Sequence, residues 1–197
     1  MMRAEILVFD GVDELDFVGP YEVLARAVAG APGSSVRLVS LHGPRAHRGQ
    51  CGLRFESEGP RDAAPDLLLV PGGGWAARSP VGAWGEHERG ELTAALAASA
   101  PRARLLASVC TGAMLLAASG VITGRRAATH ASAAPELAAF GVQVVDERVV
   151  DDGDLVSCGG VTSGIDLALH IVEREFGDAT AARIAKGIEY PRYRALG

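Results

Sequence analysis

The sequence of 197 residues contains three cysteines and no C-x-x-C pair, so it predicts no disulfide framework and a reducing, cytoplasmic setting. It has no run of lysine and arginine, and its formal net charge is −5, which argues against direct binding of nucleic acid. No apolar run reaches the roughly 18 residues that a membrane span requires. The N-terminus turns acidic too early for a signal peptide. We therefore expect a cytoplasmic protein without membrane or nucleic-acid partners.

The composition is that of a globular protein, with 48% apolar residues and a mean hydropathy of +0.18. Neither an internal repeat nor a linker divides the chain, so residues 1–197 are expected to form one domain. Short apolar runs that are typical of buried strands alternate with segments of helical periodicity. Strands are predicted at 4–11, 35–43, 52–59, 65–74 and 103–109, and around an acidic turn within 142–160; helices are predicted at 15–30, 86–99, 111–120 and 162–177.

This alternation predicts an α/β fold with a mostly parallel sheet that is covered by helices on both faces. In such a sheet ligands bind at the carboxyl ends of the strands. Three predicted strands lead there, into Asp10–Asp16, Pro71–Gly74 and Cys110. Side chains of these three segments are therefore the first candidates for a functional site.

Cys110 lies where an apolar strand meets a helix, in the stretch "RLLASVCTGAMLLAASG". Ser108 and Gly112 stand two residues away on either side, and a nucleophile on a sharp strand-to-helix turn needs small neighbours at those offsets. The N–H groups of a helix N-terminus also favour a thiolate, so we expect a thiol pKa below the ordinary value of about 8.5. The alternative is an inert cysteine in the core, since free cysteines are among the most buried residues.

Four segments resemble the ThiJ/PfpI superfamily, which has the flavodoxin-like fold of class I glutamine amidotransferases. They are "FDGVDELDFVGPYEVLARA", "LLVPGGGW", "VCTGAMLLAASGVITGRRAATH" and "DLVSCGGVTSGIDLALHIVER". The matches are spread from Ile6 to about Tyr190, and they are most similar to an isonitrile hydratase-like branch. The same branch contains the N-terminal domains of certain AraC-type regulators.

The resemblance implies a set of catalytic and binding residues. It places Cys110 on the nucleophile, Asp16 on an acid that reaches the sulfur, and Thr111 in the Cys-Thr-Gly sequence of the branch. The sites of oxyanion and substrate binding that it implies are Gly73, Gly72 and His130. The residues themselves also allow other roles, because an aspartate can cap a helix, glycines can form a tight turn and a histidine can belong to a core.

Departures from the superfamily narrow the expected chemistry. No H-x-E pair occurs, which argues against a glutamine amidotransferase, and Thr111 stands where the peptidases have histidine. Ala131 follows His130 where the branch has tryptophan, which changes the shape of the pocket. The C-terminal "KGIEYPRYRALG" resembles the tail of the stand-alone proteins, which lack the helix-turn-helix domains of the regulators.

The expected activity is that of a lyase which hydrates an isonitrile to an N-substituted formamide. The Cys110 thiolate would attack the carbon, protonated Asp16 would act as the acid, and water would hydrolyse the thioimidate. No metal or organic cofactor is expected. The alternative is a non-enzymatic domain that senses a small molecule or an oxidant, related to AraC-type regulators. The expected partners are a small-molecule substrate and a second copy of the chain in a homodimer.

Overall fold

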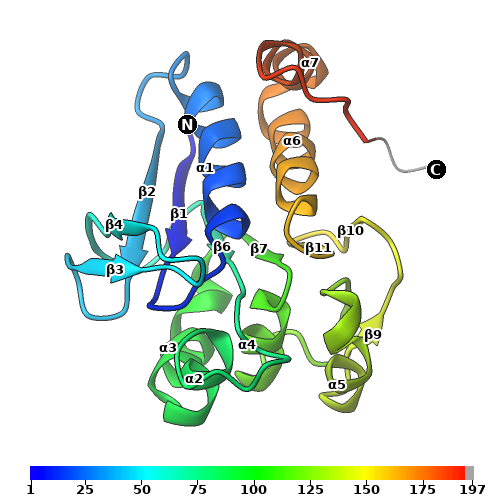
Figure 1. The fold of residues 1–197 in the computed structure, drawn as a ribbon. Coiled ribbons are helices and arrows are strands. Elements are labelled where there is room, and N and C mark those ends of the chain that lie inside the picture. The colour runs from blue at the N-terminus through cyan, green and yellow to red at the C-terminus, as the bar shows by residue number, and fades with distance from the viewer. Residues whose placement is uncertain (194–197) are drawn as a thin grey trace.

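The computed structural model describes residues 1–193 and is built around a seven-stranded sheet (Figure 1). The strand order is β10-β11-β7-β6-β1-β2-β5, and every neighbouring pair is parallel except β10 and β11. The strands are β1 (Arg3–Leu7), β2 (Ser35–Ser40), β5 (Gly59–Pro60), β6 (Leu67–Val70), β7 (Leu105–Val109), β10 (Val149–Asp151) and β11 (Leu155–Cys158). The predicted α/β fold with a mostly parallel sheet is confirmed.

Two groups of helices pack on the sheet, and the direction of the strand connections explains why the helices that follow β1 and β6 lie on different faces. The connection from β1 to β2 runs one way along the sheet and the connection from β6 to β7 runs the other way. Because such crossovers are right-handed, the connecting helices lie on opposite faces. One group is α1 (Glu14–Val28), α6 (Ser163–Phe176) and α7 (Asp178–Gly187), and the other is α2 (Ala83–Arg89), α3 (Glu91–Ser99) and α4 (Gly112–Ala118) (Figure 1).

Two local predictions are wrong. The helix predicted over 86–99 is two helices, because Gly90 takes a φ of 77° and ends α2 in the left-handed conformation. The strand predicted over 52–59 does not enter the central sheet as a whole. Its middle forms β4 (Arg54–Glu56), which pairs with β3 (Ala46–Arg48) in a separate antiparallel hairpin, and only its end belongs to β5.

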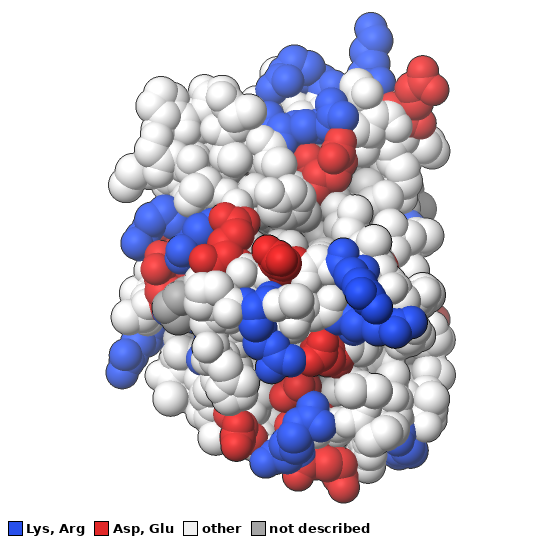
Figure 2. Space-filling view, turned by 60° about the vertical axis from the view of Figure 1, so that its left-hand side comes forward, with Lys and Arg blue, Asp and Glu red and all other residues white. Residues whose placement is uncertain are grey.

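Smaller elements complete the part of the chain that the structure describes. They are α5 (Ala134–Ala139), the parallel pair β8 (Arg126–Ala127) and β9 (Gln143–Val144), and the short 3-10 turns Ala100–Arg102 and Ala131–Ala133. Within residues 1–193, no helix is both long enough and apolar enough to cross a membrane. Figure 2 shows acidic and basic side chains interspersed on the face that it presents, without a broad area of one sign among the described residues.

The central strands explain the position of the site. Every side chain of β6 and β7 is buried, as expected for parallel strands that are covered on both faces. The carboxyl ends of β1, β6 and β7 meet at one edge of the sheet because these strands are parallel neighbours. The segments that follow them are therefore brought together, and these are the three segments that the sequence pointed to.

Candidate active site

Cys110 occupies a sharp turn between β7 and α4. Its φ is +55°, a left-handed value that is rare outside glycine, and its N–H donates to the Gly159 carbonyl at 3.0 Å. Its own carbonyl accepts from the Thr129 hydroxyl at 2.9 Å. A Cβ at Gly112 would lie 1.9 Å from the Val70 carbonyl oxygen, so only glycine fits there. The predicted sharp turn with small neighbours is confirmed, and its backbone is strained.

Asp16 reaches this turn from the first turn of α1 and is buried completely. Its Oδ2 accepts from the Gly72 N–H at 2.9 Å, while its Oδ1 is buried without a hydrogen-bond partner of good geometry among residues 1–193. The carboxyl also lies against the Cys110 thiol and interacts with it. Asp16 is not the helix cap, because Asp13 takes that role by accepting from the Leu15 N–H at 3.1 Å. The structure thus brings Asp16 and Cys110 together.

The two groups titrate in an order that burial determines. Burial raises the pKa of Asp16 to about 7, against smaller lowering contributions from the Gly72 N–H and the Cys110 thiol. Burial also raises the pKa of the Cys110 thiol to about 12, and the Asp16 charge adds to the increase. The expectation of a lowered thiol pKa is therefore wrong. A helix N-terminus stabilises the thiolate by up to about 2 kcal/mol. Burial can raise a pKa by about 3 to 5, and each step of one corresponds to about 1.36 kcal/mol, so the effect of burial on the thiol is the larger of the two.

The N–H groups of Gly72 and Gly73, which the resemblance implies for oxyanion binding, are both occupied by hydrogen bonds within the site. The Gly72 N–H donates to Asp16, and the Gly73 N–H donates to the Thr111 hydroxyl at 3.0 Å. A Cβ at Gly72 would meet the Thr111 hydroxyl at 2.3 Å, so this glycine is needed for close packing. Gly72 and Gly73 thus position Asp16 and Thr111 instead of presenting free donors to a ligand.

The backbone donors that face the sulfur come from Thr111 and Val161, and both lower the thiol pKa. Thr111 was a candidate, whereas Val161 was missed. Val161 has a φ of +43°, a genuine outlier for a β-branched residue. Next to it, the Thr162 hydroxyl accepts from Arg148 at 3.1 Å. No pattern in the sequence could reveal a residue that acts through its main chain in a strained conformation.

His130 lines the same cavity but does not reach the thiol. Its Nδ1 accepts from the Ser132 N–H at 3.2 Å, which caps a 3-10 turn, and its ring packs on Gly160. No hydrogen bond between His130 and Cys110 occurs in the described chain. His130 is thus a partly exposed residue of the cavity wall, and its part in the chemistry stays a prediction.

A cavity of about 300 Å³ is lined by Cys110 together with Thr111, His130, Val161, Gly74 and Gln50. This volume accommodates a small organic substrate. Among residues 1–193, no group of three or more His, Cys, Asp or Glu side chains has the arrangement of a metal site. The cavity is lined by Cys110, whose thiol interacts with the buried Asp16 carboxyl and faces the backbone N–H groups of Thr111 and Val161. A thiol, a carboxyl group and backbone donors are the groups that covalent catalysis on a small electrophile requires.

Comparison with known proteins identifies the family. Residues 2–174 match the DJ-1/PfpI family. The isonitrile hydratase of Pseudomonas putida is 35% identical over 191 residues, which are 96% of this chain and 78% of that enzyme. The transcriptional regulator GbdR of Pseudomonas aeruginosa is 31% identical over 148 residues, which are 73% of this chain and 38% of the regulator. The crystal structure of a ThiJ/PfpI family protein from Pseudomonas syringae superimposes with a TM-score of 0.85 at 25% identity, covering 100% of this chain and 78% of that one. The chain therefore belongs to the DJ-1/PfpI family.

Proposed function

We propose that the protein hydrates isonitriles to N-substituted formamides, with Cys110 as the nucleophile and Asp16 as the group that transfers the proton. One observation carries the proposal: the buried Asp16 carboxyl, with a pKa of about 7, lies against a thiol on a strained turn below a small-molecule cavity. A group that titrates near neutrality both takes and returns a proton efficiently. The similarity to an isonitrile hydratase over nearly the whole chain supports the choice of substrate class.

In the first step the isonitrile carbon lies over the sulfur. When Asp16 is ionised, the pair of Asp16 and Cys110 still holds one proton, because the pKa of the thiol is about 12 and the thiol is protonated at neutral pH. Asp16 accepts this proton as the sulfur–carbon bond forms, and then delivers it to the same carbon. The product is a thioimidate in which the carbon carries one hydrogen, the sulfur of Cys110 and a double bond to nitrogen. The N–H groups of Thr111 and Val161 stabilise the negative charge that develops on the sulfur.

In the second step water attacks the thioimidate carbon. One proton of the water passes to the substrate nitrogen, and the carbon–sulfur bond breaks as the second proton returns through Asp16 to the pair. The products are the N-substituted formamide and the free thiol. Isonitrile and water are consumed in equal amounts, and no electrons are exchanged with another molecule.

The test is turnover of a panel of isonitriles by the purified protein, with formation of the formamide followed by mass spectrometry. Cys110→Ser is the matched control because it is nearly isosteric and retains a hydroxyl in place of the thiol. We expect turnover by the wild type and none by the variant. Absence of turnover of every isonitrile, or undiminished turnover by Cys110→Ser, contradicts the proposal.

A second function is favoured by the similarity to GbdR: a domain that binds a small molecule without converting it. This function uses the same cavity and needs no proton transfer. It is distinguished by incubation with an isonitrile and a search for an unchanged ligand that co-purifies with the protein. Retention of the ligand with unaltered mass, together with no formamide, supports the binding domain over the enzyme.

A further inference from the structure

We propose that the substrate is an elongated isonitrile with a carboxylate at the end remote from the reacting carbon, and that Arg48 binds this carboxylate. This inference rests on the proposed function for the reacting group and extends it to the rest of the substrate. A second cavity, of about 570 Å³, adjoins the one that holds Cys110. The two share Gln50, Gly74 and Ala77 in their walls, so a substrate that is attached at the sulfur has a path into the second cavity.

The wall of the second cavity suits an aliphatic chain with a polar end. Glycine, alanine and valine residues form much of it, including Gly74, Ala77 and Val81. Two charged residues also line it, Asp10 and Arg48. The Asp10 carboxylate is already paired within the protein, because one of its oxygens accepts from the Arg45 guanidinium and the other from the Arg48 N–H. The charge that is available to a ligand is therefore positive.

Arg48 stands at the end of β3, and its guanidinium lies over Gly52, where a Cβ would be 3.6 Å from Nη2. In the described part of the chain the guanidinium has neither an ion pair nor a hydrogen bond. The backbone N–H of Arg48 donates to Asp10 at 2.9 Å and holds the main chain of Arg48 beside the cavity. A guanidinium presents a planar fork of donors that matches the two oxygens of a carboxylate. Arg48 is thus the residue of the second cavity that can recognise an anionic group.

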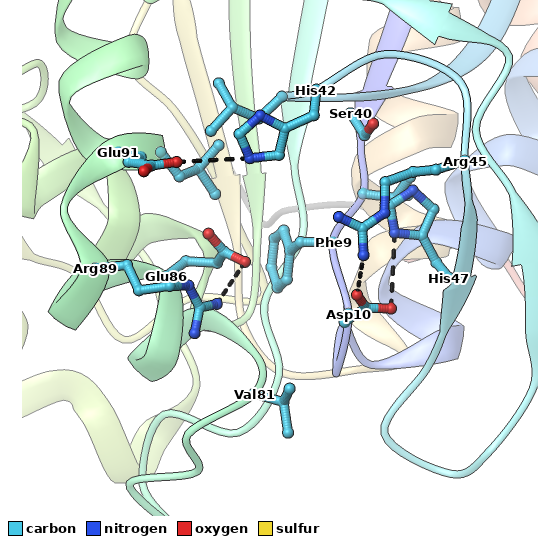
Figure 3. Close-up of a pocket in the computed structure, with 13 residues that line it drawn as sticks. Phe9, Asp10, Ser40, His42, Arg45, His47, Val81, Glu86, Arg89 and Glu91 are labelled. Carbon is cyan, nitrogen blue, oxygen red and sulfur yellow. Dashed lines mark hydrogen bonds and ion pairs between the residues drawn. The ribbon is translucent and has the colours of Figure 1, made fainter.

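A third cavity, of about 280 Å³, continues from the second through Asp10 and Val81, and its charges are paired with one another. Figure 3 shows Arg45 and Asp10 on one side and the pair Arg89–Glu86, 2.7 Å apart, on the other. These pairs leave its two arginines already engaged with acids. The contrast with Arg48 favours the second cavity as the end point for the carboxylate.

The experiment measures the affinity of a reagent for the second cavity through its rate of alkylation of Cys110, so it does not depend on turnover. The probes are iodoacetamides that carry an aliphatic chain with a terminal carboxylate, in a series of chain lengths, each with a neutral alkyl partner of equal length. The protein carries Cys51→Ser, because Cys51 is exposed and would also react. Mass spectrometry of the peptide that contains Cys110 gives the rate for each reagent at low concentration. Comparing two reagents on the same thiol cancels its intrinsic reactivity.

We expect at least one chain length at which the carboxylate reagent reacts about tenfold faster than its neutral partner, as a charge-assisted hydrogen bond provides. Arg48→Gln should abolish the preference. Arg54→Gln should retain it, since Arg54 faces Arg48 across the hairpin, carries the same charge and lines none of the three cavities. A preference at no chain length, one that survives Arg48→Gln, or one lost equally in Arg54→Gln overturns the inference. Failure of the hydratase proposal shows instead as an absence of isonitrile turnover, which these rates do not measure.

Discussion

The Asp16 carboxyl and the Cys110 thiol influence each other in opposite directions. The neutral thiol interacts with the carboxylate and lowers the Asp16 pKa, whereas the carboxylate charge raises the thiol pKa. Burial acts more strongly on both and raises both values, to about 7 and about 12. The pair therefore loses its first proton near neutrality and its second far above it, and over this interval it holds one proton.

The first prediction is a pH profile with a single rise. The proposed first step needs ionised Asp16, because the carboxylate must accept the proton of the thiol. Isonitrile turnover at low substrate concentration should therefore be slow in acid, rise as the pH passes about 7 and stay level above it. Initial rates across this interval give the profile. A rate that is greatest in acid and falls through neutrality would mean that protonated Asp16 is the working form.

The second prediction concerns Asp16→Asn, which keeps an oxygen for the Gly72 N–H but removes the charge. The thiol pKa should fall relative to the wild type, because the carboxylate no longer opposes ionisation, and stay above the ordinary value, because burial remains the larger cause. Turnover should fall by roughly 10²- to 10⁴-fold, the usual contribution of a general acid or base. The rate of alkylation by iodoacetamide against pH gives the thiol pKa.

Asp13→Asn is the control for this prediction. Asparagine can cap α1 as aspartate does, and the Asp13 charge is a smaller cause of the raised thiol pKa than the Asp16 charge. We expect a smaller shift in the thiol pKa and retained turnover. An equal shift in both variants, or full turnover by Asp16→Asn, would show that the carboxyl of Asp16 has no special relation to the thiol.

The turn at Cys110 could be predicted from the sequence because its requirements are local. Small residues on both sides of Cys110 and a buried strand before it are visible in one short stretch. The break at Gly90 was missed, since the apolar spacing continues on both sides of it and glycine alone does not fix the sign of φ. The fold depends on patterns that repeat along the chain, and these patterns predicted the parallel sheet.

The electrostatics of the site could not be predicted in the same way. The sequence places Cys110 at a helix N-terminus, which favours the thiolate, but α4 has only seven residues and Cys110 is only 6% exposed. How deeply a side chain is buried depends on every segment packed around it. The N–H groups of Gly73 and Val161 illustrate the same limit. One is occupied by the Thr111 hydroxyl and the other faces the sulfur, and both facts arise only in three dimensions.

The third prediction is that Gly112→Ala is strongly destabilising. The new Cβ would lie 1.9 Å from a backbone oxygen of Val70, which cannot move without displacing β6 from the sheet. The free energy of unfolding should fall by about 3 kcal/mol or more, measured by urea denaturation. Gly30→Ala is the control, since its Cβ would meet no atom within 4 Å, and it should be neutral within about 0.5 kcal/mol. Equal stability of the two variants would contradict the close approach of α4 to β6.

The last prediction separates the side chain of Val161 from its backbone. At a φ of +43° alanine is strained and glycine is not, so Val161→Gly should be more stable than Val161→Ala by about 1 kcal/mol. Ile165, inside α6, is the matched control, and the order should reverse there because glycine is the poorer helix former.

Turnover should fall in Val161→Gly, whose N–H is no longer held towards the Cys110 sulfur, and persist in Val161→Ala, which keeps the backbone restricted. Urea denaturation and isonitrile turnover of the four variants test both parts. Greater stability of Val161→Ala than of Val161→Gly would contradict backbone strain at this position. Equal turnover of the two variants would show that the orientation of this N–H towards the sulfur does not affect the reaction.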